Sequence, residues 1–94
     1  MKRVVVIYDV GDDRRRLRLA RSLQARGLAR VQRSAFTGVM RPGDARELER
    51  LARAVVDLER DVVHIIPVSP ADWKNVIIVG VEWGRAHVKG ATII

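Results

Sequence analysis

The hydrophobic and polar positions of this 94-residue chain predict alternating strands and helices. Short β-branched runs bounded by charges or turn residues are typical of strands. The predicted strands cover residues 4–8, 28–33, 35–40, 62–68 and 75–81, where 28–33 and 35–40 are two strands or one long bent strand. Apolar residues at helical spacing predict one helix over about 14–26, stopped at Gly27, and a second from 42 or 44 through 58.

The order strand–helix–strand–strand–helix–strand, plus one further strand, predicts an α+β sandwich of the ferredoxin-like kind. We expect residues 1–81 to form this domain and residues 82–94 to form a tail, exchanged with or packed against a dimer partner. Helices cover only one face of such a sheet, yet residues 4–7 and 76–79 are apolar on both faces. We therefore expect a homodimer packed sheet to sheet, in which the terminal strand can pair with the partner's edge.

The positive charge is concentrated in the first third of the chain. The net charge is +7 from 18 Lys and Arg against 11 Asp and Glu. Residues 1–33 contain ten of these cations and three of these acids, which gives +7, so the remaining eight and eight cancel. A basic field beside a carboxylate indicates phosphate chemistry or binding to a nucleic-acid backbone.

Two absences narrow the class of protein. Cysteine is absent, which excludes a disulfide framework and a thiolate metal site. Because no apolar segment is long enough to span a bilayer, we expect a cytoplasmic protein without a membrane partner.

Asp9 directly follows the first predicted strand and begins a turn. A strand-end carboxylate suits Mg²⁺, or Mn²⁺ in its place, because this ion takes one or two carboxylates and keeps several waters. From the residue alone, an aspartate that accepts turn amides is the better-supported interpretation. Two-fold symmetry changes this, because one Asp9 from each subunit can build a shared metal site. Asp12 and Asp13 are expected to cap the following helix.

The first helix separates its arginines by direction. Leu19, Ala20 and Leu23 define the buried side. The arginines expected on a solvated face for phosphate contacts are Arg14, Arg15, Arg18, Arg21 and Arg26. Arg16 is in register with the apolar stripe, so it either leans toward the end of the first strand near Asp9 or extends along apolar surface to solvent.

The chain has few other residues suited to chemistry. Phe36 either stacks on a base or fills a core or a dimer interface. Trp73 and Trp83 either anchor a partner surface or fill the core. His64 and His87 are expected to be structural. Ser34 has no basic partner fixed by spacing, which argues against a nucleophilic serine.

The first part of the chain contains a series of short motifs. They are Tyr8-Asp9-Val10 after a strand, Asp12-Asp13, Arg16 and Arg18, then Gly27-Leu28-x-Arg30-Val31-Gln32-x-Ser34-Ala35-Phe36-x-Gly38. These motifs resemble the second CRISPR-associated (Cas) protein family, the small ferredoxin-fold proteins of spacer acquisition. The resemblance covers roughly residues 3–81, with Ala35 as a mild departure where a branched aliphatic residue is usual.

The resemblance implies a homodimer that assembles with the CRISPR integrase and helps to insert new spacers. It also implies metal-dependent endonuclease activity on the phosphodiesters of single-stranded RNA or double-stranded DNA. The family's metal-binding aspartate falls on Asp9, and its other functional positions fall on Tyr8, Arg16, Arg18, Arg30 and Phe36.

Three alternatives stay open from the sequence. A non-catalytic bridge holds DNA and integrase in register through its basic segment alone. A ribonuclease toxin of related fold uses similar phosphate contacts. A ferredoxin-fold module for small anions, such as an acylphosphatase-like enzyme, is permitted because fold does not fix function.

Overall fold

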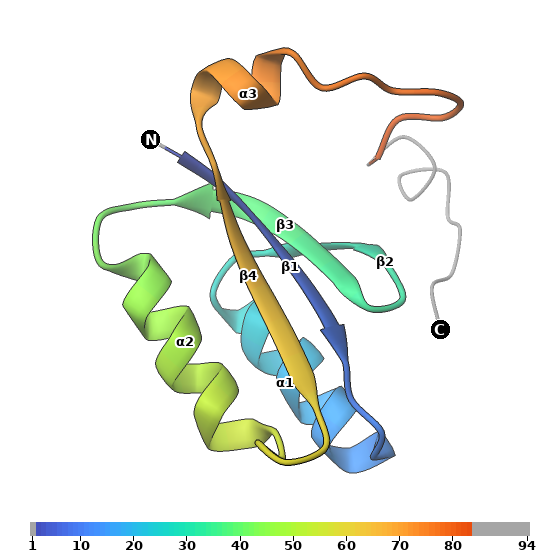
Figure 1. The fold of residues 1–94 in the computed structure, drawn as a ribbon, viewed down its shortest axis with the longest axis vertical. Coiled ribbons are helices and arrows are strands. Elements are labelled where there is room, and N and C mark those ends of the chain that lie inside the picture. Colours follow the sequence, from blue (N-terminus) through green and yellow to red (C-terminus); the bar gives the residue numbers. More distant parts are fainter. Residues whose placement is uncertain (1, 84–94) are drawn as a thin grey trace.

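The computed structural model describes residues 2–83, which form four strands and three helices (Figure 1). In chain order these are β1 (Lys2–Asp9), α1 (Asp13–Ala25), β2 (Ala29–Gln32), β3 (Ala35–Met40), α2 (Asp44–Val55), β4 (Val62–Val68) and α3 (Pro70–Lys74). The predicted order is confirmed as far as β4. The predicted boundaries agree within two residues, except at the end of α2.

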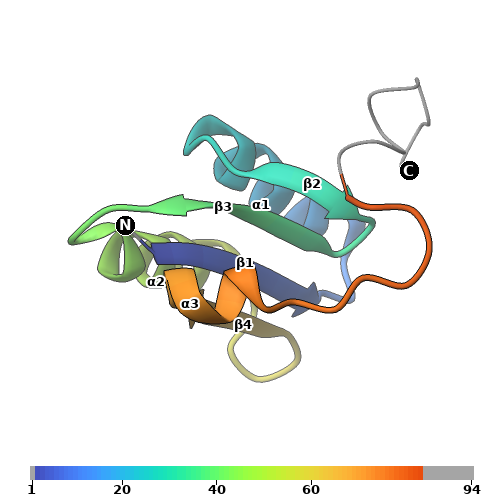
Figure 2. The same ribbon diagram turned by 90° about the horizontal axis from the view of Figure 1, so that it is seen from above.

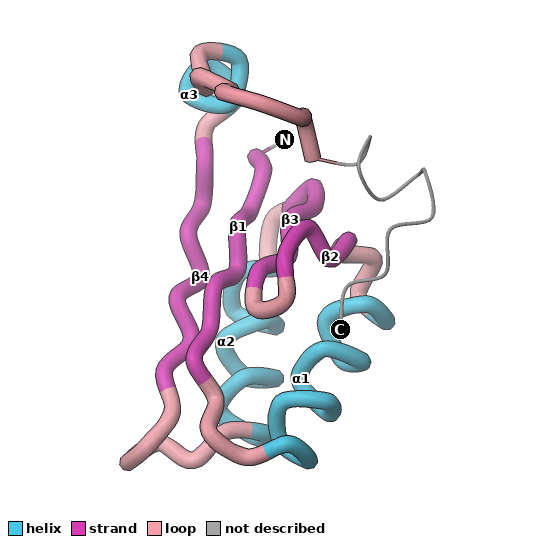
Figure 3. Tube along the Cα trace, turned by 90° about the vertical axis from the view of Figure 1, so that its right-hand side faces the viewer, coloured by secondary structure: helices cyan, strands magenta, loops and turns pink. Residues whose placement is uncertain are grey.

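The four strands form one antiparallel sheet in the order β2-β3-β1-β4. Both long helices, α1 and α2, pack against one face of this sheet, as the side view in Figure 3 shows. This is the predicted ferredoxin-like sandwich. β2 and β3 are separate strands joined by a tight turn at residues 33–34, with a bulge between Arg30 and Gln32.

The core lies between the sheet and the two long helices. Successive side chains of a strand point to opposite faces, and in β1 the buried ones are Val4, Val6 and Tyr8. From α1, Leu19 and Leu23 pack into the same cluster. Burial of each such side chain stabilises the fold by about 1.5–3 kcal/mol, so the strand-to-helix packing is the main source of stability.

Two glycines have clear local reasons. Gly27 follows α1 with a φ of +87°, a left-handed conformation that ends the helix at the predicted place. Gly38 in β3 lies under Leu28, where a Cβ would come within 3.2 Å of the Leu28 Cγ. The sheet and the segment before β2 therefore approach each other closely at this glycine.

The opposite face of the sheet, turned away from α1 and α2, is apolar and exposed. The ladder register puts Val39, Val62 and Ile66 on this face together with Ile7. Their exposed fractions are 53%, 46%, 41% and 45%. We call this the open face. The prediction that β1 carries apolar residues on both faces is confirmed, and a partner subunit covering the open face stays a prediction.

The second helix ends earlier than predicted. α2 stops at Val55 rather than at residue 58, because the next carboxylates bind backbone amides in competition with the helix. The Asp57 side chain accepts from the amide of Glu59, and the Asp57 amide donates to Asp61. These contacts build the turn that leads into β4.

The single chain has no strand at residues 75–81, and the expected pairing of this segment with a partner's edge stays a prediction. Ser69 caps a short helix instead, with its hydroxyl accepting from the Asp72 amide and Pro70 at the first helical position. Residues 76–79 have no regular secondary structure and pair with no described strand, and Gly80 has a φ of +99°. An apolar segment forms a strand only where it can pair with the edge of a sheet. After α3 the chain runs from the β4 side of the sheet toward the β2 side, without pairing with an edge strand (Figures 1 and 2).

The predicted tail, residues 82–94, lies almost wholly outside the described residues, and His87 lies there as well. No helix within residues 2–83 has the length and apolar character to cross a membrane.

Candidate functional site at the end of strand β1

Asp9 is the last residue of β1, and its side chain is exposed. Tyr8 points into the core, so the alternation along the strand turns Asp9 to the open face, together with Ile7. Across the ladder Asp9 lies opposite Val62, the first residue of β4. The carboxylate therefore stands at one end of an exposed apolar surface.

The turn after Asp9 is held by Arg16. Val10 is buried, and its carbonyl oxygen accepts a hydrogen bond of 2.9 Å from Arg16 Nη1. Arg16 also pairs with Asp13 in the first turn of α1. The prediction that Arg16 leans toward the end of the first strand is confirmed, through the backbone beside Asp9.

The helix after this turn begins as predicted. Asp12 is the N-cap residue, and its carboxylate accepts a 2.9 Å hydrogen bond from the Arg15 amide. Such a cap stabilises a helix by about 1 kcal/mol. Asp13 lies in the first turn, where its negative charge suits the helix dipole.

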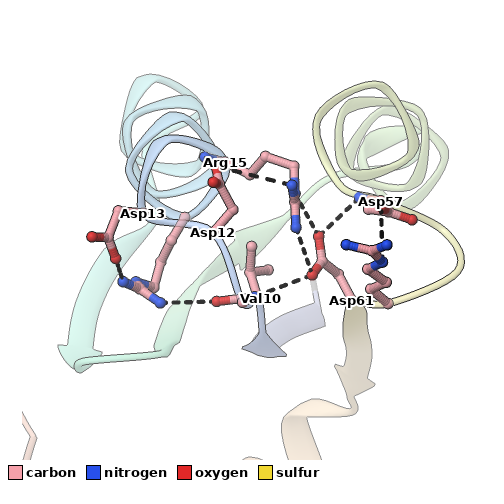
Figure 4. Close-up of polar contacts among 9 residues, drawn as sticks. Val10, Asp12, Asp13, Arg15, Asp57 and Asp61 are labelled. Atoms are coloured by element: carbon pink, nitrogen blue, oxygen red, sulfur yellow. Dashed lines mark hydrogen bonds and ion pairs between the residues drawn. The ribbon is translucent and has the colours of Figure 1, made fainter.

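Asp61 is a residue that the sequence analysis did not single out. Its side chain is fully shielded from solvent and accepts from two backbone amides and a guanidinium (Figure 4). The donors are Gly11 N at 3.1 Å, Asp57 N at 2.8 Å, Arg15 Nε at 2.8 Å and Arg15 Nη2 at 3.2 Å. The Arg15 guanidinium, supported by the two amides, holds the pKa of Asp61 far below its ordinary value.

The expectation that Arg15 belongs to a solvated phosphate-binding face is therefore wrong, because Asp61 neutralises it. Arg26 also departs from that expectation, since its Nη2 lies 2.8 Å from Glu47 of α2. The signal that could have found Asp61 is an acidic residue directly before an apolar strand, where a charge has to be paired if it is buried.

Tyr8, Phe36 and Arg30 lie together on the helix-facing side of the sheet. The rings of Tyr8 and Phe36 stack with centroids 6.2 Å apart, and the Arg30 guanidinium carbon lies 5.3 Å from the Phe36 centroid. The Tyr8 hydroxyl donates to the Arg33 carbonyl oxygen at 3.4 Å. Phe36 has an exposed fraction of 0%, so the base-stacking role is wrong for this conformation and its core role is the one observed.

Arg14, Arg18 and Arg21 gather on the outer surface of α1, as the helical spacing predicted. They line a shallow groove with Leu17, and all four side chains are exposed. This surface lies away from the sheet. The structure therefore separates Arg18 from Asp9, whereas it brings Arg16 close to the backbone that carries Asp9.

The remaining candidates are His64, Trp73, Trp83 and Ser34. His64 is exposed and lies opposite Ile7 in the ladder. Trp73 is half-buried, and the Arg3 guanidinium carbon lies 4.7 Å from its ring centroid. The exposed fraction of Trp83 is 43%. The Ser34 carbonyl oxygen accepts from the Tyr8 amide, which ties the β2–β3 turn to β1.

Asp9 is the candidate metal ligand of this chain. In residues 2–83 no three His, Cys, Asp or Glu side chains converge on a common point. Asp9 supplies one exposed carboxylate, and two copies meeting at the open face supply two. That number fits the one or two carboxylates that Mg²⁺ takes while keeping its waters.

Comparison with known proteins identifies the family. The sequence model for CRISPR associated protein Cas2 matches residues 1–76. This chain belongs to the Cas2 family. The match spans β1 to the end of α3, so it includes every strand of the described sheet and the positions Tyr8, Asp9, Arg16, Arg18, Arg30 and Phe36.

A curated relative supports this assignment, and two solved structures share the fold. A CRISPR-associated endoribonuclease Cas2 from Archaeoglobus fulgidus is 41% identical over 81 residues, which cover 83% of this chain and 86% of that protein. A crystal structure of a hypothetical protein from Thermus thermophilus has a TM-score of 0.72 at 34% identity, covering 85% of this chain and 92% of that one. The crystal structure of Streptococcus pyogenes Cas2, at 24% identity and a TM-score of 0.66, shares the fold and covers 83% of this chain and 99% of that chain.

One relative joins two proteins of the CRISPR system. A Cas1/Cas2 endonuclease fusion from Thermoproteus tenax is 47% identical over 60 residues, covering 63% of this chain and 23% of the fusion. The Cas2 part of that fusion corresponds to this chain.

Proposed function

We propose that this Cas2 protein is an endonuclease of CRISPR adaptation that cleaves RNA or DNA phosphodiesters with Mg²⁺, or with Mn²⁺ in its place. The working unit is a homodimer in which the open faces of two subunits meet. The observation that carries the proposal is the exposed carboxylate of Asp9 at one end of an uncovered apolar face. Relatives named as endoribonucleases support the reaction class.

In this proposal one Asp9 from each subunit binds the metal. The bound ion supplies Lewis-acid polarisation of the scissile phosphodiester. Arg16 fixes the backbone that carries Asp9 through its 2.9 Å hydrogen bond to Val10. Tyr8 anchors the same strand in the core from the other face. Both residues keep the carboxylate at a constant place on the open face.

The other family positions act on the strand or on the fold. Arg18 binds phosphates from the outer surface of α1, with Arg14 and Arg21. Arg30 contacts phosphate at the edge strand β2 while its guanidinium lies over Phe36. Phe36 supports both Arg30 and Tyr8 by packing, which replaces base stacking as its role.

The partner in the cell is the CRISPR integrase. The fusion of Cas1 to Cas2 in a relative supports this, because covalent joining of two chains keeps proteins that work together at high effective concentration. Insertion of new spacers is then the process that this dimer serves.

A second candidate function is a bridge that holds nucleic acid beside the integrase without cutting it. The observation that favours it is the distance in the fold between the arginine groove of α1 and the open face. Phosphate contacts position a strand without chemistry, so the groove works whether or not Asp9 binds metal.

The deciding experiment is a Mg²⁺ titration of purified wild type and Asp9→Asn on labelled single-stranded RNA and duplex DNA. We expect Mg²⁺-dependent cleavage by the wild type and at least a 100-fold loss in Asp9→Asn, with an unchanged dimer by sedimentation. The control is Glu49→Gln, which neutralises an exposed carboxylate on α2, on the side of the sheet away from the open face. Equal cleavage by all three proteins contradicts the proposal and indicates a contaminating nuclease. If none of them cleaves, the proposal is also contradicted and the non-catalytic bridge is the function that stands.

A further inference from the structure

The turn after Asp9 is fixed from a second side by Asp61, which no comparison or motif singled out. Asp61 directly precedes β4, and the first residue of β4 lies opposite Asp9 in the ladder. The Asp61 carboxylate binds the amide of Gly11, two residues beyond Asp9. Asp61 is thus connected to the end of β1 in two ways, through the pairing of β1 with β4 and through the hydrogen bond from the Gly11 amide.

This carboxylate connects three segments that meet at the same end of the molecule (Figure 4). Gly11 belongs to the β1–α1 turn, Arg15 to the first turn of α1 and Asp57 to the α2–β4 turn. Each carboxylate oxygen of Asp61 accepts two hydrogen bonds, with donor–acceptor distances of 2.8–3.2 Å. A buried charge with this set of donors is held in one orientation, because any rotation breaks several charge-assisted bonds.

The position of Asp9 matters more than that of an ordinary surface carboxylate. A Mg²⁺ ion demands ligand distances of about 2.0–2.1 Å in near-ideal geometry. In the proposed function the two ligands come from different subunits of the same sequence. A change in the β1–α1 turn therefore displaces both Asp9 carboxylates of the site. A site of this kind needs supporting residues that hold its ligands within about 0.5 Å.

We propose that Asp61, paired with Arg15, is a positioning residue for metal binding by Asp9. It fixes the Gly11 amide and so the direction in which the chain leaves β1, while Arg16 fixes the Val10 carbonyl from the other side. This inference rests on the proposed function, because it concerns the affinity of the Asp9 pair for a divalent ion. Asp61 itself touches neither metal nor nucleic acid.

The test measures Mn²⁺ binding to the dimer by the electron paramagnetic resonance signal of free Mn²⁺, with Mg²⁺-dependent cleavage as a second readout. We expect Asp61→Asn to weaken Mn²⁺ binding about 10-fold, as loss of a residue that orients a metal ligand typically does. At saturating metal its cleavage rate returns close to that of the wild type. Asp9→Asn, in contrast, loses the rate at every metal concentration.

Two further proteins separate positioning from a general effect on stability. Glu47→Gln breaks the ion pair of Glu47 with Arg26, which joins the end of α1 to α2, and its pair with Arg50 within α2, both far from the β1–α1 turn. We expect it to bind Mn²⁺ as the wild type does. If Asp61→Asn does not fold, the double variant Arg15→Met/Asp61→Leu replaces the buried pair by apolar side chains, an exchange that is often neutral for stability. It still lacks the acceptor for Gly11, so the same 10-fold loss is expected.

The outcomes distinguish the two proposals. If the wild-type protein binds no more Mn²⁺ than Asp9→Asn does, the proposed function fails. If the wild type binds Mn²⁺ and a folded, dimeric Asp61 variant binds it equally well, the positioning role is wrong while the proposed function stands. Weaker binding by Glu47→Gln, to the same extent as by Asp61→Asn, also overturns the positioning role, because the effect is then one of stability.

Discussion

The rings of Tyr8 and Phe36 stack in the core, 6.2 Å between centroids, with an angle of 24° between their planes. Both residues belong to the motif by which the chain resembles its family, yet exposed fractions of 4% and 0% leave them no surface for a nucleotide. Their contribution to a site passes through the strand that ends in Asp9.

Substitution of Phe36 tests this interpretation. We expect Phe36→Ala to lower the free energy of unfolding by about 3–5 kcal/mol through the cavity that it leaves, and Phe36→Leu to lower it less. The measurement is urea denaturation followed by circular dichroism, with Leu58→Ala, at an exposed leucine outside the sheet, as a near-neutral control. A Phe36→Leu protein that keeps wild-type stability and loses nucleic-acid binding supports a stacking role instead.

The open face gives a prediction about assembly. Ile7 lies in the middle strand pair of that face and is 45% exposed. Because burial of a carboxylate against a second apolar sheet is unfavourable, Ile7→Glu is expected to give a monomer in sedimentation at micromolar concentration. Leu58→Glu places the same charge on an exposed leucine outside the sheet and leaves the dimer intact. A dimer that survives in Ile7→Glu means that the subunits meet elsewhere.

Asp61 predicts how stability changes with pH. Its pKa in the folded protein lies well below the unfolded value of about 3.9. A depressed pKa contributes stability that is fully present above the unfolded value and is lost as the pH falls toward the folded one, here below about pH 5. We expect the difference in urea midpoint between wild type and Asp61→Asn to be largest at pH 7 and to shrink at pH 3. A constant difference contradicts this.

The arginine groove of α1 predicts a salt dependence. Each phosphate neutralised by a cation contributes about 0.9 to the slope of log affinity against log salt for duplex DNA. The triple variant Arg14→Gln/Arg18→Gln/Arg21→Gln is expected to bind more weakly at low salt and to have a slope smaller by about 0.9 for each lost contact. The triple variant Arg46→Gln/Arg50→Gln/Arg53→Gln removes the same charge from α2 and should keep the wild-type slope. Identical slopes for the two variants would contradict this, because nucleic acid would then be attracted by the total positive charge and not by the α1 arginines in particular.

Much of the fold is predictable from the sequence because it depends on local patterns. The β-branched run ending at Asp9, the cap at Asp12 and the stop at Gly27 each act within a few residues, and the structure has all three. The same holds for the direction of Arg14, Arg18 and Arg21, since helical periodicity alone turns them from the core.

Other features depend on contacts between distant segments. Residues 75–81 have the composition of a strand, but whether they form one depends on a free edge that this chain does not bring to them. The pairing of Arg15 with Asp61 joins residues 46 positions apart, so no local pattern shows that the two are partners. The burial of Phe36 is likewise decided by the helices that cover it.

The sequence by itself determined the family, the sandwich of two helices on a sheet and the place of Asp9 at a strand end, because local spacing and short motifs specify these. Only the tertiary structure decided which arginines are available to phosphate, which aromatic rings are buried and which carboxylate fixes the turn after β1. These are consequences of burial and long-range pairing, and both arise only when α1, α2 and β4 pack around β1.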